Sequence, residues 1–134
     1  MLVRRMMIGL GAAMTGGLLA FGTIPAQASV HRTELHAALH GSHAFPRAAG
    51  HATFEIRNDG RELDVRVSHI ARLAGKRLVV FVHGARAGTM TVTMAGTAHL
   101  DRHGVPATKA GQMIRVRTNA AGTLVASGTF HRDN

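Results

Sequence analysis

The clearest structural pattern in the chain is Arg77-Leu-Val-Val-Phe-Val-His-Gly-Ala-Arg-Ala-Gly-Thr-Met-Thr-Val-Thr-Met94. Its first half is apolar at consecutive positions, as in a strand covered on both sides, whereas its second half alternates Thr with Met and Val, as in a half-buried strand. The glycine-containing segment 83–88 lies between them and predicts a turn. We therefore predict a central β-hairpin in a small β-sandwich or open barrel.

A second hairpin is predicted upstream of this stretch. Apolar and charged residues alternate in segments 53–57 and 63–67, and residues 58–61 (Asn-Asp-Gly-Arg) supply a turn between them. Pairing Arg57 with Glu62 keeps the apolar residues of both segments on one face, whereas a slip of one residue would expose half of them. The same alternation predicts that strand structure begins at about residue 52.

Further strand patterns lie downstream. A short strand is expected at 97–100, a loop at 101–111, and a last hairpin at 112–118 and 123–130. Short strands separated by frequent turns are typical of all-β domains. The sequence therefore predicts one all-β domain over residues 52–134, a small antiparallel β-sandwich or open barrel of about seven short strands.

Several glycine and apolar positions of residues 52–130 also match a known pattern. They are Val80-Phe81-Val82-x-Gly84, Gly88-Thr89, Ala98-x-Leu100, Pro106, Gly111 and Gly128-Thr129-Phe130. In these positions the chain resembles a group of small exported bacterial β-sandwich proteins that have no assigned activity. The resemblance implies the fold and export, and it implies no catalytic residue.

Residues 1–28 have the features of a cleaved signal peptide. Arg4 and Arg5 form a charged head, residues 6–21 form an apolar run interrupted by glycines, and residues 26–28 (Ala-Gln-Ala) form a small-x-small cleavage box. We predict cleavage after Ala28, a secreted or extracytoplasmic location and no transmembrane segment after processing. The arginine pair is compatible with twin-arginine export and with the general route. A membrane anchor is the alternative, which the glycines disfavour.

Histidines are concentrated just after the predicted cleavage site. His31, His36, His40 and His43 lie among alanines in residues 29–51, where the apolar content is small. Thr33 is a suitable cap for a short helix over residues 34–39, which Gly41 would end. We therefore predict that residues 29–51 form a flexible, histidine-rich arm before the β-domain.

This arm offers two candidate metal sites. Cleavage after Ala28 would leave Ser29-Val30-His31 at the new amino terminus, where the amine, two backbone amides and the His31 ring can bind Cu(II) or Ni(II) in a square plane. On a helix, His36 and His40 would share one face, with His43 nearby, as a softer second site suited to Zn(II). The other reading of these histidines is a solvated polar arm.

The charge of the chain favours anionic partners. Lys and Arg outnumber Asp and Glu by 16 to 7. Arg57, Arg66, Arg115 and Arg117 are candidates for one polyanion-binding face, and an ordinary basic surface is the alternative. The chain has no Trp or Tyr, which argues against specific binding of nucleic acid or carbohydrate by stacking. It also has no cysteine, so the domain has no disulfide to stabilise it.

Templates for catalysis are absent from the sequence. There is no Gly-x-Ser-x-Gly motif and no cysteine nucleophile, and Ser68 and His69 would point to opposite faces of a strand. Glu55, Glu62 and Asp64 fit a solvated lattice with arginines better than a catalytic carboxylate pair.

The predicted function follows from these patterns. It is an exported, non-enzymatic binding or cell-envelope-associated module with a basic surface and no cofactor. Its expected partner is an anionic cell-envelope polymer or another protein. The alternative is a secreted metal-handling protein for Cu, Ni or Zn that uses Ser29, Val30, His31 and the histidine-rich arm.

Overall fold

The computed structural model describes residues 33–119 and 121–132. This part contains β-strands and one short 3-10 helix, η3 (Ala71–Leu73), and no α-helix. The strands are β1 (Thr33–Gly41), β2 (Ala49–Arg57), β3 (Gly60–Ser68), β4 (Arg77–Val82), β5 (Ala85–Thr91), β6 (Ala98–His103), β7 (Met113–Arg117), β8 (Leu124–Thr129) and β9 (His131–Arg132). The predicted all-β class is confirmed.

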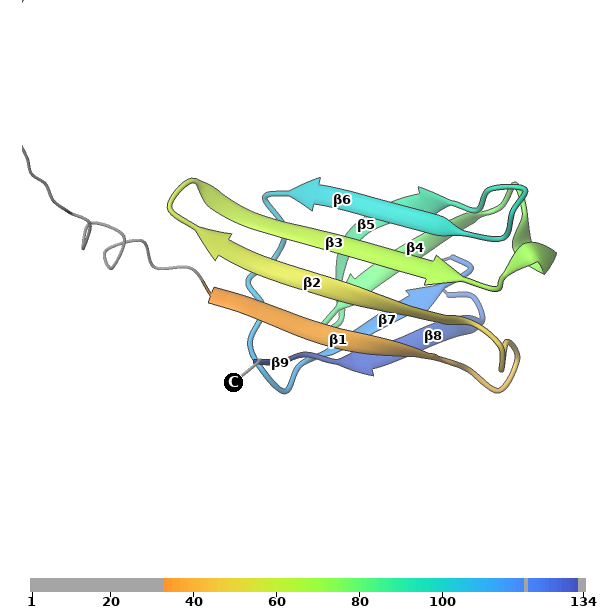
Figure 1. Cartoon of the computed structure of the whole chain (residues 1–134), viewed down its shortest axis with the longest axis horizontal. Helices are drawn as coiled ribbons and strands as arrows, with labels where there is room; N and C mark the ends of the chain where they lie inside the picture. Colours follow the sequence, from red (N-terminus) through yellow and green to blue (C-terminus); the bar gives the residue numbers. More distant parts are fainter. Residues whose placement is uncertain (1–32, 120, 133–134) are drawn as a thin grey trace, which may run out of the picture. The chain divides into compact units, whose positions relative to one another are not determined.

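The strands form one antiparallel sheet that is nearly closed into a barrel (Figure 1). Their order is β5-β4-β7-β8-β1-β2-β3-β6, and β9 pairs with β1. The two end strands approach each other, because a Cβ atom added to Gly88 in β5 would lie 3.1 Å from Leu100 Cδ1 in β6. The hairpin β4–β5 therefore lies at one end of the sheet, and its predicted central position is wrong.

Strand β1 corrects the prediction of a flexible arm. Residues 33–41 form a strand that pairs with β2, β8 and β9, and no helix covers residues 34–39. Leu35, Ala37 and Leu39 are 1%, 1% and 2% exposed and alternate with residues that face outward, so the period of two prevails over the helix-capping signal. The β-domain therefore includes residues 33–51, which were predicted to lie outside it, and β2 begins at Ala49.

The hairpin β2–β3 has the predicted faces but a different register. Arg57 pairs with Gly60 and Phe54 with Leu63, a shift of two residues from the expected pairing of Arg57 with Glu62. The cause is a tight turn, in which only Asn58 and Asp59 separate the strands. Because side chains alternate with a period of two, this shift keeps every apolar residue on its face.

The hairpin β4–β5 is also tighter than predicted. His83 and Gly84 form its turn with φ angles of 50° and 82°. Two positive φ angles are the signature of a type I′ turn, which matches the twist of the paired strands. The turn predicted over residues 83–88 is longer than the observed one. Val82 and Ala85 are already paired, and the register of the two strands shifts at a bulge between Val80 and Phe81.

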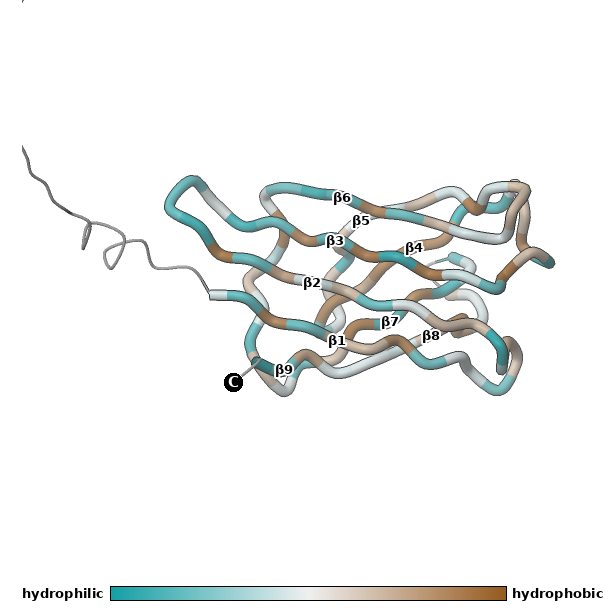
Figure 2. The backbone as a smooth tube through the Cα atoms, viewed as in Figure 1, coloured by the Kyte–Doolittle hydropathy of each residue, from teal (hydrophilic) through white to brown (hydrophobic). Residues whose placement is uncertain are grey.

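The core lies inside the curved sheet. Apolar side chains alternate with polar ones along β2 and β3, which Figure 2 shows as brown and teal segments in succession. Phe54 and Phe130 are 0% and 1% exposed and meet edge to face, with ring centroids 6.5 Å apart. Without cysteine, this packing and the strand hydrogen bonds hold the described domain together.

Candidate functional site

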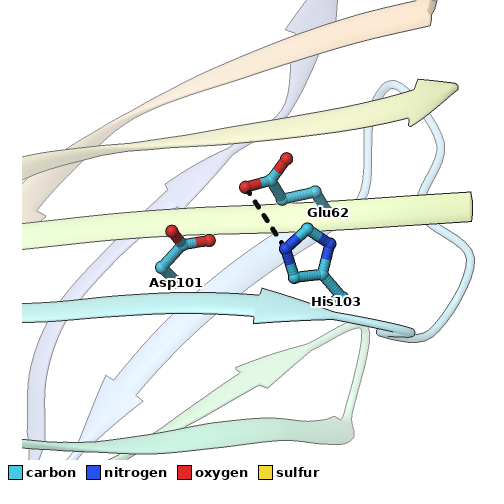
Figure 3. A group of neighbouring side chains, drawn as sticks. All are labelled: Glu62, Asp101 and His103. Carbon is cyan, nitrogen blue, oxygen red and sulfur yellow. Dashed lines mark ion pairs between the residues drawn. The ribbon is translucent and has the colours of Figure 1, made fainter.

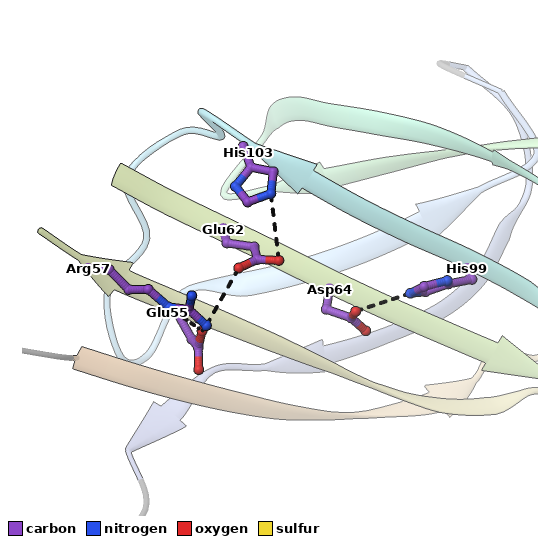
Figure 4. A network of polar contacts seen from close by, with 6 residues as sticks. All are labelled: Glu55, Arg57, Glu62, Asp64, His99 and His103. Carbon is purple, nitrogen blue, oxygen red and sulfur yellow. Dashed lines mark hydrogen bonds and ion pairs between the residues drawn. The ribbon is translucent and has the colours of Figure 1, made fainter. Parts of the chain in front are cut away.

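The outward face of β2, β3 and β6 carries most of the described carboxylates. We call it the acidic face. It consists of Glu55, Arg57, Glu62, Asp64, Arg66, His99, Asp101 and His103. These side chains point outward because they alternate with buried residues such as Leu63 and Val65. Figure 4 shows six of them converging over the three strands.

The strand register sets like charges opposite one another on this face. Glu55 pairs with Glu62, and Asp64 pairs with Asp101. Directly opposed like charges destabilise a sheet. Arg57 partly relieves the first pair, since its Nε donates to Glu55 Oε1 at 3.0 Å and its guanidinium lies 3.8 Å from Glu62 Oε1.

Two basic side chains relieve the second pair. Arg66 Nε lies 3.4 Å from Asp64 Oδ1, and His99 Nε2 lies 3.1 Å from Asp64 Oδ2. No arginine of the acidic face contacts Asp101 in the way that Arg66 contacts Asp64. Asp101 lies beside Glu62 instead. The face is therefore a partly compensated carboxylate lattice, as predicted for Glu55, Glu62 and Asp64, with an excess of acid near Asp101.

Glu62, Asp101 and His103 form the closest group of potential metal ligands in residues 33–119 and 121–132 (Figure 3). One donor atom from each lies within 4.8 Å of the others, and Glu62 Oε2 is 3.8 Å from His103 Nε2. A hydrogen bond with Asp101 raises the pKa of Glu62, and lost hydration and the Asp101 charge add to the rise. His103 and Arg57 lower the pKa of Glu62 and oppose that rise.

This pKa shift predicts the effect of Glu62→Gln on the pH dependence of stability. Because the folded-state pKa of Glu62 is raised, the folded chain binds the proton more tightly than the unfolded chain. Wild-type stability therefore falls as pH rises from the ordinary value of 4.5 through the folded-state pKa. We expect the stability of Glu62→Gln relative to wild type to increase across that window, as measured by urea unfolding at a series of pH values.

Glu34→Gln is the matched control for this measurement. Glu34 is a carboxylate on β1 that faces Glu55 across the strand pair, but it lacks the contact with Asp101. Its substitution removes one carboxylate without altering the contact between Glu62 and Asp101, so it controls for the loss of a single negative charge. A stability difference between Glu62→Gln and wild type that stays constant with pH would contradict the prediction.

A second surface lies on β4 and β7. We call it the arginine face. It consists of Phe81, His83, Met113, Arg115 and Arg117, which with Gly84, Gly111 and Gln112 line an open hollow of about 610 Å³. Phe81 lies opposite Arg115 on β7 and opposite Arg86 on β5. The aromatic ring is therefore flanked by arginines on both sides.

No carboxylate lies on β4, β5, β7 or β8 among the described residues. The described carboxylates are Glu34, Glu55, Asp59, Glu62, Asp64 and Asp101, on β1, β2, β3, β6 and the β2–β3 turn. Arg115 and Arg117 contact neutral atoms: Arg115 reaches Met113 Sδ at 3.6 Å, and Arg117 donates to the Gly122 carbonyl at 3.1 Å. No carboxylate of the described residues therefore neutralises the charge of Arg115 or Arg117.

The four arginines predicted as one polyanion-binding face lie in two places. Arg57 and Arg66 are on the acidic face and pair with Glu55 and Asp64. Arg115 and Arg117 are on β7, which β8 and β1 separate from β2. Alternation along each strand was correctly inferred, but the sequence does not show which strands are neighbours.

The helix on which His36 and His40 were predicted to share one face does not form. The two histidines lie on strand β1, where a separation of four residues places their backbone positions about 13 Å apart. His36 Nε2 instead lies 3.4 Å from Glu34 Oε1, and His43 lies in the turn after β1. The predicted signal peptide and Ser29, Val30 and His31 lie outside the described residues, so their roles stay predictions.

Ser68 and His69 also differ from expectation. His69 has a positive φ of 63°, which breaks the strand alternation and brings its Nδ1 within 3.1 Å of Ser68 Oγ. In the described part of the chain no carboxylate pairs with His69 to orient the ring. A catalytic serine needs an oriented base, so the pair lacks one element of that machinery.

Sequence reasoning missed the group of Glu62, Asp101 and His103. Residues 101–111 were predicted as a loop, whereas β6 extends to His103. The pattern His99-x-Asp101-x-His103 is a period-two signal that could have extended the strand. The pairing of β6 with β3 has no local signal of this kind.

Comparison with known families and with curated proteins yields no match to this chain. Within residues 33–119 and 121–132, no helix has the length and apolar character needed to cross a membrane.

Proposed function

We propose that the chain is an exported, non-enzymatic binding module of the cell envelope whose arginine face binds an anionic polymer. The observation that carries this proposal is that the described carboxylates are confined to one part of the sheet, so the arginines elsewhere have no acidic partner among the described residues. All described carboxylates lie outside β4, β5, β7 and β8, whereas these four strands carry Arg77, Arg86, Arg115 and Arg117. The signal-peptide pattern of residues 1–28 supports the extracytoplasmic location.

The geometry of β7 suits a repeating anion. Arg115 and Arg117 are two residues apart on one strand, so their backbone positions lie about 7 Å apart on the same face. The guanidinium groups can each contact a separate anionic group along a polymer, with charge-assisted hydrogen bonds. The hollow between β4 and β7 is open, which suits an extended chain.

The composition of the arginine face favours recognition by charge. Its single aromatic ring is Phe81, which is half-buried and flanked by Arg86 and Arg115. Binding of single-stranded nucleic acid usually relies on several stacked bases. We therefore propose an anionic cell-envelope polymer, rather than a specific nucleic acid, as the partner.

Titration with inorganic polyphosphate at several salt concentrations tests the proposal. Binding by charge releases counterions, so affinity should fall linearly on a logarithmic scale as salt rises. The double variant Arg115→Ala/Arg117→Ala should lower that slope by about 1.4, which is about 0.7 for each lost phosphate contact on a single-stranded polyanion. Its affinity at low salt should be at least about tenfold weaker, equivalent to about 1.4 kcal/mol.

Arg57→Ala/Arg66→Ala is the matched control, because it removes the same charge from the acidic face. Its slope should match that of wild type, since Arg57 and Arg66 are engaged with carboxylates. Equal losses in the two double variants would show that only net charge matters, and an affinity independent of salt would refute charge-based binding. Either result would overturn the assignment to the arginine face.

A further inference from the structure

We infer that Glu62, Asp101 and His103 form a binding site for a divalent transition metal, with Zn²⁺ as the best fit. These residues lie on the acidic face, away from β4 and β7, so the inference is independent of polymer binding. It also differs from the sites predicted in residues 29–51. The site takes its ligands from two paired strands.

The register of β3 and β6 creates the site. Glu62 lies directly opposite His103, and Asp101 lies two residues before His103 on the same face of β6. The three side chains thus project over one point on regular strands, which hold donor groups more precisely than loops do. Figure 3 shows the carboxylates and the imidazole turned toward one another.

The distances are close to those that zinc requires. The donor atoms lie within 4.8 Å of one another. Bonds of 2.0–2.2 Å in a tetrahedral site would place ligand atoms about 3.3–3.6 Å apart. Glu62 Oε2 and His103 Nε2 are already 3.8 Å apart, and the 79% exposed side chain of His103 has room to rotate.

The donor types select the metal. Two carboxylate oxygens and one imidazole nitrogen are ligands of Zn²⁺ and of neighbouring transition metals, whereas Ca²⁺ takes six to eight oxygen ligands. Three protein ligands leave at least one coordination position for water or for a ligand from solution. Because Glu62 is 24% exposed and the other two residues are exposed, an ion from solvent can reach the site.

Neighbouring residues orient Glu62 and add negative charge close to the site. Arg57 lies 3.8 Å from Glu62 Oε1, which leaves Oε2 directed at His103. Metal-binding carboxylates are commonly held in this way by a partner on the other oxygen. Asp64, which lies opposite Asp101, adds a further carboxylate nearby. A dication would relieve the repulsion between Glu62 and Asp101, which no arginine of the face neutralises fully.

Zinc titration by calorimetry of the untagged mature chain, which begins at Ser29 if cleavage falls after Ala28 as predicted, tests the inference. A His31→Ala background removes the predicted amino-terminal site, and we expect one zinc ion per chain in that background. Glu62→Gln and His103→Ala should each weaken zinc binding at least tenfold. His99→Ala removes a histidine from the same strand and should leave zinc affinity unchanged, because His99 pairs with Asp64 outside the group.

Thermal unfolding separates metal binding from damage to the fold. Saturating zinc should raise the unfolding temperature of the His31→Ala chain and of His99→Ala, but not of Glu62→Gln or His103→Ala. All four should unfold cooperatively without zinc; the side chains of Glu62, His99 and His103 lie outside the core. Absence of zinc binding in the His31→Ala chain would overturn the inference. The inference would also be overturned if Glu62→Gln and His103→Ala bound zinc as tightly as the His31→Ala chain does.

Discussion

A chain that begins at Ser42 is expected not to fold. Strand β1 lies between β8 and β2 in the sheet, so its removal separates β5-β4-β7-β8 from β2-β3-β6. It would also expose the long paired edge of β2, to which β1 is matched from Thr33 to His40. Exposed edges and lost core contacts both favour unfolding and aggregation. The truncated chain should lack the far-ultraviolet circular dichroism of a folded sheet and be cleaved rapidly by protease.

Point substitutions within β1 make the same test quantitative. Leu39 is 2% exposed in the core, so Leu39→Ala should lower the free energy of unfolding by about 2–5 kcal/mol. His40 is its exposed neighbour on the same strand, and His40→Ala should change that free energy by at most about 0.5 kcal/mol. Urea unfolding measures both values. If the truncated chain unfolded cooperatively and both variants were as stable as wild type, β1 would not be needed for folding. The prediction of a flexible arm would then be correct.

The position of β1 shows why sequence patterns predict some strands and miss others. Segments 53–57 and 63–67 alternate large apolar residues with charged ones, and the structure places strands there. In β1 the inward residues include only two leucines, with Ala37 between them. Histidine, alanine and a capping threonine fit a helical turn equally well by composition. Burial against β2 and β8 decides the conformation, and that is a long-range effect.

The pairing register of the strands was predicted less well than their buried faces, because the register depends on the length of the turns. A strand face depends on the period of two, which the sequence displays directly. Pairing depends on turn length, and Asn58-Asp59 and His83-Gly84 both form two-residue turns where longer ones were expected. His83 has a positive φ, but His-Gly is not one of the residue pairs typical of I′ turns, which are Asn-Gly, Asp-Gly and Gly-Gly, so the turn had a weak signal.

The candidate sites depend on which strands are neighbours. Glu62 and Asp101 are far apart in the sequence and meet because β3 pairs with β6. Arg57 and Arg115 have similar local patterns but lie on strands that β8 and β1 separate. The composition predicted a basic surface, and only the strand order shows that the described carboxylates are absent from the four neighbouring strands β5, β4, β7 and β8. Long-range pairing supplied this information, and no local motif encodes it.

Phe54→Ala is expected to lower the free energy of unfolding by about 3–5 kcal/mol, the range for losing a large buried aromatic side chain. Phe54 is 0% exposed on β2 and packs edge to face against Phe130, which lies between β8 and β9. The ring therefore bridges elements on both sides of β1, and alanine would leave a cavity at that point. Met94→Ala is the control, because Met94 is 86% exposed and its truncation should cost at most about 0.5 kcal/mol.

A double-mutant cycle with Phe130→Ala isolates the contact between the two rings. Both single variants should be destabilised by several kcal/mol, because both rings are buried. The double variant should be less destabilised than the sum of the two by about 0.5–1.5 kcal/mol, the usual energy of an aromatic pair. Urea unfolding gives all four free energies. Strict additivity, or a loss in Phe54→Ala no larger than in Met94→Ala, would mean that the rings do not join the two parts of the sheet in solution.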